Sequence, residues 1–96
     1  MAKGAARIGD ITTGHDCHPP QVAIKGSRNV KINGRGALRL GDKFMPHCCG
    51  YTCHPGFLAE GSGTVSINGI PAGRIQDSIM CGGSVATASS DVLIGG

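Results

Sequence analysis

The sequence predicts an all-β protein in which three short hairpin-like repeats pack around a pseudo-threefold axis. Two short sequence motifs, each of which we call a phrase, recur in the same order along the 96 residues. Helical patterns are nearly absent, because glycines interrupt every candidate segment and no window keeps an apolar period of 3.6 residues. One repeat alone cannot bury its apolar face, so we expect the three repeats to share one core.

The first phrase carries an arginine three residues before an aspartate, and it occupies residues 4–10, 36–42 and 71–77. We interpret the recurring arginines as structural residues that pair with a nearby aspartate or an edge carbonyl, in preference to a phosphate-binding role. The second phrase alternates Val and Ile with polar residues, as a strand does, and it occupies residues 26–34, 61–69 and 89–96. Two copies end in Asn-Gly, which favours a type I′ turn because both residues accept positive φ. We therefore expect hairpins over residues 30–40 and 65–75.

The expected domain organisation is a single domain over residues 1–96, with repeats at about 4–34, 36–69 and 71–96. A chain of this length buries a small share of its surface. The sequence has 17 glycines, two Phe, one Tyr and no Trp, so its core is thin and its backbone is costly to order. We therefore expect an additional cross-link, such as a structural metal ion.

Charge and composition exclude several classes of protein. The formal net charge is only +3 and the basic residues are scattered, which gives little support to nucleic-acid binding. No apolar run approaches the roughly 18 residues of a membrane span. The first seven residues lack the apolar segment of a signal peptide, so we expect synthesis in the cytoplasm. Five cysteines is an odd number, and metal binding explains them better than a complete disulfide framework does.

Metal-binding side chains are concentrated between residues 44 and 56, which hold two of the four histidines and three of the five cysteines. Each repeat also places one such side chain four or five residues after its aspartate, and the longest insert adds a fourth. The predicted ligands are therefore His15, His47, His54 and Cys81. Three histidines and one cysteine suit a closed tetrahedral Zn²⁺ site, and iron fits this donor set less well.

Other assignments of the cysteines and histidines remain open. One of the four ligands could be replaced by Cys53, Cys49 or His18. Cys17 could instead form a disulfide with Cys48 or Cys49. Some of these residues could also be ordinary buried thiols and loop histidines, because free cysteine is often a core residue.

An enzymatic role is not expected. A closed metal site leaves no open position for a substrate, and the single glutamate, Glu60, lies six residues beyond His54. Cys53 and His54 could be read as a nucleophile and its base, but neighbouring residues rarely face each other and no third orienting group is evident. The alternative function is a small zinc-binding regulatory or nucleic-acid-binding module.

The repeated phrases identify a resemblance to a known family. Pro-Ala-Gly-Arg at residues 71–74, with its counterparts at 36–39 and 4–7, resembles the proline-alanine-alanine-arginine (PAAR) repeat. The Gly-Ser-x-x-Val-x-x-Asn-Gly phrases resemble the second hallmark of that family. The resemblance covers essentially the whole chain. Departures are local: only the third copy keeps the proline, Leu38 or Gly73 replaces the second alanine, and Gln76 replaces the glycine before Asp77.

The resemblance implies a small cone that caps the blunt end of a trimeric β-helical spike in a contractile phage tail or a type VI secretion system. It implies one chain per spike trimer, a Zn²⁺ ion near the sharp vertex, and hairpins that form the base docked on the spike. A metal pin at the vertex would stiffen a point driven transiently into the target-cell envelope. We expect no fused toxin domain within this sequence, and no enzymatic activity.

Overall fold

The computed structural model describes residues 2–96, and Met1 lies outside this range. Paired strands, isolated bridges and turns make up the described chain, which measures 38 × 26 × 22 Å along its principal axes. Each sheet has two antiparallel strands. Residues 2–96 contain no helix with the length and apolar character needed to cross a membrane. The strands are β1 (Lys3–Gly4), β2 (Lys31–Ile32), β3 (Arg35–Gly36), β4 (Lys43–Cys49), β5 (Thr52–Phe57), β6 (Ser66–Ile67), β7 (Ile70–Pro71) and β8 (Leu93–Ile94).

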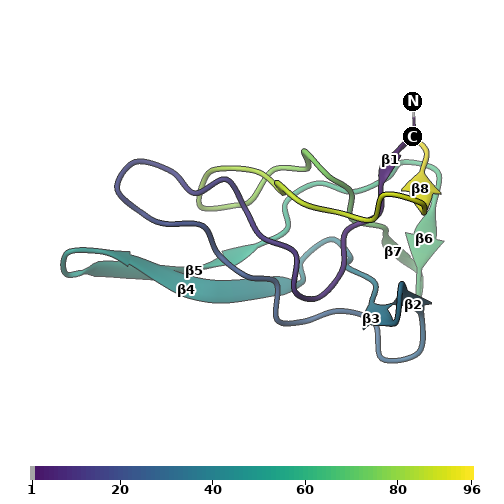
Figure 1. The fold of residues 1–96 in the computed structure, drawn as a ribbon, viewed down its shortest axis with the longest axis horizontal. Helices are drawn as coiled ribbons and strands as arrows, with labels where there is room; N and C mark the ends of the chain where they lie inside the picture. Colours follow the sequence, from purple (N-terminus) through teal and green to yellow (C-terminus); the bar gives the residue numbers. More distant parts are fainter. Residues whose placement is uncertain (1) are drawn as a thin grey trace.

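Three of the four sheets are very short and lie together at one end of the long axis (Figure 1). We call this end the base. The sheet of β4 and β5 extends from the centre toward the other end, which we call the tip. The chain segments that follow the first and third aspartates run in the same direction, so the inserts emerge at one end of the structure.

Two of the base sheets are the hairpins expected from the Asn-Gly signals. Asn33 and Gly34 join β2 to β3 with φ values of 54° and 78°, and Asn68 and Gly69 join β6 to β7 with 56° and 77°. Positive φ at both turn residues is the mark of a type I′ turn. The paired strands are shorter than the predicted hairpins, because the residues beyond them bridge to neighbouring repeats, as Arg39 does to Ala72.

The third base sheet joins the two ends of the described chain. Strand β1 pairs with β8, with Lys3 opposite Ile94 and Gly4 opposite Leu93. In the other two repeats a turn connects the corresponding strands. The third repeat is therefore completed by the strand that opens the first.

A closed ring of backbone hydrogen bonds marks the pseudo-threefold axis. The amide of Leu38 donates to Ala6 O at 2.9 Å, Gly73 N donates to Leu38 O at 2.8 Å, and Ala6 N donates to Gly73 O at 3.0 Å. These residues occupy the same position in the three repeats, and all three are buried. The predicted all-β fold with pseudo-threefold symmetry is confirmed.

Two apolar clusters form the core, and both draw on all three repeats. The cluster at the base takes one isoleucine and one alanine from each repeat: Ile32, Ile67, Ile94, Ala5, Ala37 and Ala72. The second cluster lies toward the tip and contains Ala6, Ala23, Leu38, Phe44, Leu58, Ile79 and Val85. The only described aromatic ring in these clusters is that of Phe44, which agrees with the thin core expected from the composition.

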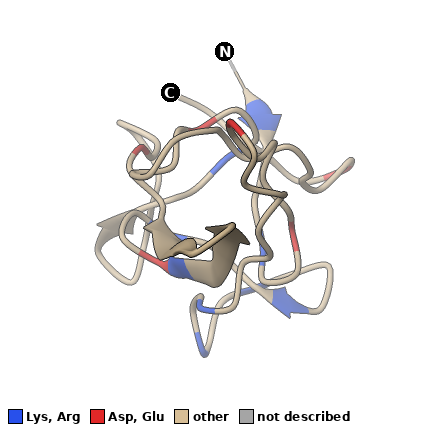
Figure 2. Cartoon of the chain, turned by 90° about the vertical axis from the view of Figure 1, so that its left-hand side faces the viewer, with Lys and Arg blue, Asp and Glu red and all other residues tan. Residues whose placement is uncertain are grey.

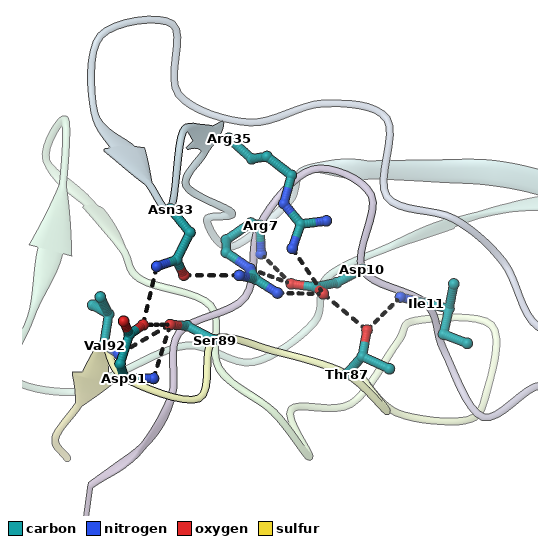
Figure 3. A network of polar contacts seen from close by, with 9 residues as sticks. All are labelled: Arg7, Asp10, Ile11, Asn33, Arg35, Thr87, Ser89, Asp91 and Val92. Carbon is teal, nitrogen blue, oxygen red and sulfur yellow. Dashed lines mark hydrogen bonds and ion pairs between the residues drawn. The ribbon is translucent and has the colours of Figure 1, made fainter.

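In each repeat an arginine–aspartate pair holds the turn, and the pair is buried in the first and third repeats and partly buried in the second. In the first pair, Asp10 accepts hydrogen bonds from Arg7 N at 2.7 Å, from Nε at 3.0 Å and from Nη2 at 3.0 Å (Figure 3). The same three contacts recur between Arg39 and Asp42 and between Arg74 and Asp77. The hydrogen bond to the aspartate raises the pKa of each arginine, and the structural interpretation of these arginines is confirmed.

Candidate metal centre

The long hairpin of β4 and β5 carries two histidines toward the tip. His47 on β4 lies directly opposite His54 on β5, and Cys48 lies opposite Cys53. Directly opposed residues of an antiparallel pair project from the same face, whereas successive residues alternate between faces. Both histidines are therefore on one face of the hairpin, and the two cysteines are on the other.

A tight turn in the first insert supplies two more histidines. The amide of His15 donates to His18 O at 3.1 Å, and His18 N donates to His15 O at 2.8 Å. Their rings stack at a centroid distance of 4.8 Å. Ring centroids across the whole group are 4.5 to 5.2 Å apart, and one ligand atom from each of the four histidines lies within 4.8 Å of the others.

The nitrogens of His15 and His47 that face each other are poised to share a cation. His47 Nδ1 lies 2.6 Å from Pro19 O, so this nitrogen carries the proton and donates, and Nε2 presents a lone pair. His15 Nδ1 lies 3.6 Å from the Asp16 carboxylate, and its Nε2 is 3.1 Å from His47 Nε2. Two ligands at about 2.0–2.1 Å from a tetrahedral Zn²⁺ are about 3.3 Å apart, close to the observed separation.

His18 and His54 follow the same pattern. His18 Nε2 lies 3.3 Å from Thr52 O, and His54 Nδ1 lies 3.3 Å from Pro55 O. His18 Nδ1 is buried and has no hydrogen-bond partner among residues 2–96. Desolvation, followed by the neighbouring His54, lowers the pKa of His18. Each histidine thus has an oxygen beside one nitrogen and leaves the other for the cluster, which fits a bound metal ion.

Cys81 lies at the edge of the histidine cluster, in the insert of the third repeat. Its Sγ is 3.9 Å from His47 Nε2 and 3.6 Å from Gln21 Oε1. Burial raises the pKa of the Cys81 thiol. The structure thus brings the predicted ligands His15, His47 and His54 together and places Cys81 next to one of them. His18, which was only an alternative ligand, is a full member of the cluster.

Disulfides account for the other four cysteines. Cys17 is bonded to Cys49, which ties the first insert to β4, and Cys48 is bonded to Cys53 across the long hairpin. The pair Cys17 and Cys49 was one of the open alternatives. The second disulfide was not anticipated, and the expectation that metal binding through some of the cysteines would replace a disulfide framework does not hold for these four. Cys49 and Cys53 are consequently not available as ligands, and Cys81 is the free thiol among the described residues.

The fold and the histidine cluster define the class of this chain. The family described as PAAR motif matches residues 51–96, which include β6, β7, β8 and the third repeat. This stretch of the chain carries the PAAR motif, and the resemblance found in the repeats is confirmed.

Two curated relatives come from Pseudomonas aeruginosa, and each is 43% identical over 81 residues, or 78% of this chain. One is the NAD(P)(+) glycohydrolase toxin Tse6 of strain PAO1, of which the match covers 19%. The other is the (p)ppApp synthetase toxin Tas1 of strain UCBPP-PA14, of which it covers 18%. The chain therefore spans about a fifth of the length of these relatives.

Proposed function

We propose that this chain is a structural spike-tip protein that caps the blunt end of a trimeric β-helical spike in a contractile injection machine. The observation that carries the proposal is the base, where three equivalent two-stranded sheets surround a pseudo-threefold axis. One chain of this shape presents a similar surface three times, so it matches three identical subunits at once. The PAAR motif at residues 51–96 supports a type VI secretion spike or a phage tail as the setting.

The base sheets suggest how the spike is bound. Each has only two strands, and Gly36 O, Pro71 O and Gly4 O on β3, β7 and β1 already accept hydrogen bonds from other parts of the chain. We therefore propose that the opposite edge of each sheet, formed by β2, β6 or β8, pairs with a strand from a spike subunit. Leu93 on β8 is 60% exposed and adds apolar surface at this end. We propose that each base sheet docks on one subunit of the trimer.

At the tip, we propose a structural Zn²⁺ ion bound by His15, His47, His54 and Cys81. These residues come from the first insert, from both strands of the long hairpin and from the third insert. One ion would hold together three chain segments where the apolar core has ended, and a tip braced in this way would resist bending during contact with the target-cell envelope. The donor set is closed and the proposed role is structural, so no enzymatic activity is proposed for this chain.

Copurification with a trimeric spike protein tests the proposed cap. Native mass spectrometry is expected to find one chain per trimer. Leu93→Glu at the base should weaken the complex, whereas Tyr51→Glu, at a fully exposed position in the turn of the long hairpin, should leave it intact. Three chains per trimer, or equal effects of the two substitutions, would contradict docking through the base.

Metal analysis of the purified protein tests the proposed zinc site. We expect one Zn²⁺ per chain in the wild type and little in His47→Ala, which removes the histidine that contacts both His15 and Cys81. Cys81→Ser and His18→Ala identify the fourth ligand: Cys81→Ser should lose zinc and His18→Ala should keep it. The reverse result would replace Cys81 by His18, and a folded wild type without bound metal would refute the site.

A further inference from the structure

A pocket of about 720 Å³ lies on the side wall, where the first repeat meets the second. Ile8 and Ile24 form its apolar part, and Lys25, Arg28 and Lys43 supply positive charge. We call it the wall pocket. Its residues belong neither to the histidine cluster at the tip nor to the base strands, so the proposed function does not use it.

Three of the four cations that line the wall pocket have no ion-pair partner among residues 2–96. Arg39, which also lines it, is bound to Asp42. Among residues 2–96, no carboxylate forms an ion pair with Lys25, Arg28 or Lys43. In the end-on view of Figure 2, several basic segments lie in the lower part of the molecule, the side on which Figure 1 shows β2 and β3, and others lie at the top near the N-terminus, whereas most acidic segments lie in the upper part.

We call each place where two repeats meet a seam: the first, around Ser27, holds the wall pocket, the second lies around Ser62 and the third around Ser89. The second and third seams show which residues the fold needs at these positions. Their positions can be matched through hydrogen bonds that recur at 2.8 Å in all three repeats, from Ser27 N to Ala37 O, from Ser62 N to Ala72 O and from Ser89 N to Ala5 O. Residues at the same distance before or after these serines, or directly after the three aspartates, are structural equivalents.

None of the three cations recurs at the other seams. The equivalents of Lys25 are Glu60 and Thr87, those of Arg28 are Gly63 and Ser90, and those of Lys43 are Ser78 and Ile11. The same backbone arrangement forms at these seams without any positive charge at these positions. Lys25, Arg28 and Lys43 therefore occur at the first seam only, and the fold does not need positive charge at these positions.

The wall pocket also lacks an acceptor that both other seams possess. Glu60 Oε1 accepts a hydrogen bond from Ser78 N at 2.9 Å, and Thr87 Oγ1 accepts one from Ile11 N at 3.1 Å (Figure 3). The residue in this place in the wall pocket is Lys25, whose ammonium group can only donate. In the wall pocket, therefore, the side chain at this position cannot accept a hydrogen bond from the Lys43 amide, as Glu60 and Thr87 do from the equivalent amides.

We propose that the wall pocket binds an acidic segment of a partner protein, in which carboxylates flank an aliphatic side chain. One carboxylate would take the acceptor position that Glu60 fills at the second seam, and the others would pair with Lys25, Arg28 and Lys43. The aliphatic side chain would cover Ile8 and Ile24. A phosphate group would leave most of the volume and the apolar part empty, so a peptide fits the pocket better.

The test uses a variant in which the second seam is copied into the first, Lys25→Glu with Arg28→Gly and Lys43→Ser. Because the second seam already folds with these residues, the variant should keep the wild-type urea midpoint. The probe is a fluorescein-labelled peptide with four Asp or Glu residues around a central leucine, in 50 mM salt. Binding should weaken at least about tenfold in the variant, since three exposed charge pairs are lost.

The matched control is Lys3→Glu with Lys31→Glu, which changes the net charge by the same amount at positions outside the pocket. It should bind the peptide within about twofold of wild type. A peptide with Asn and Gln in place of the acids should not bind, and in the wild type the acidic peptide should shift the NMR signal of the Lys43 amide.

Four results would overturn the proposal. They are an absence of binding by the wild type, equal losses in the two variants, displacement of the peptide by inorganic phosphate at equal concentration, and tighter binding to anionic phosphatidylserine vesicles than to the peptide. The last result would point to a membrane surface instead of a protein.

Discussion

The three arginine–aspartate pairs make a quantitative prediction about stability. Replacing Asp10, Asp42 or Asp77 by asparagine keeps the size of the side chain but removes its charge. One carboxylate oxygen of each aspartate accepts two hydrogen bonds from its arginine, and the other oxygen accepts a third. In asparagine an NH₂ group takes the place of one oxygen, so a donor faces a donor and a largely buried guanidinium loses its counterion.

The expected cost follows from this burial. Breaking a buried ion pair on one side costs about 3–5 kcal/mol, against a total of about 5–14 kcal/mol for a domain of this length. We expect about 3 kcal/mol for each variant. The effect should be smallest at Asp42, because the side chains of Arg39 and Asp42 are 13% and 6% exposed, compared with 7% and 1% for Arg74 and Asp77.

Urea unfolding of the metal-free, oxidised protein measures these costs. Asp16→Asn is the control, because the Asp16 side chain is 91% exposed and the substitution should change the unfolding free energy by less than about 0.5 kcal/mol. If the variants at Asp10, Asp42 and Asp77 unfold at the same urea concentration as this control, the arginine–aspartate pairs do not stabilise the fold.

Three further predictions concern single positions. Gln76 has φ of 73° at the site where the other repeats have glycine, so Gln76→Gly should raise the unfolding free energy by about 0.5–1 kcal/mol in urea titrations; a loss would show that its side chain compensates for the backbone. Because burial raises the pKa of Cys81, iodoacetamide should alkylate metal-free folded protein at pH 8 more slowly than urea-unfolded protein, and equal rates would contradict a partly buried thiol. Replacing Cys17 and Cys49 by serine opens a loop with a sequence separation of 32 and should cost about 3–4 kcal/mol in the same titrations, while an unchanged midpoint would mean that this disulfide does not form.

The repeats made most of the fold predictable. The two phrases fixed the strand-turn-strand order, and Asn33-Gly34 and Asn68-Gly69 located both type I′ turns. Threefold packing followed from repeats too small to fold alone, and the ring through Ala6, Leu38 and Gly73 bears this out. What the sequence could not show is that β1 would pair with β8, because no turn joins these strands and their pairing depends on closure of the whole ring.

The tip was predicted less completely. The hairpin of β4 and β5 was treated as part of an insert, since cysteine, histidine and proline carry little strand propensity and mask the signal. Two details could have revealed it: Gly50 at its turn, and the symmetric spacing of His47 and Cys48 against Cys53 and His54 about that turn. Disulfide connectivity cannot be deduced from five cysteines, which is why the second bridge was missed.

The pairing of β1 with β8 makes the order of the repeats cyclic. Any of the three seams could be the one at which the chain is open, because each is held by a two-stranded antiparallel sheet and by an equivalent backbone hydrogen bond from a serine to an alanine. A circular permutant that joins the present ends through a short turn and opens the chain at Gly34 would keep every strand pair. In such a molecule the tip and the wall pocket would keep their positions, while the point at which another domain could be attached would move by a third of a turn around the base.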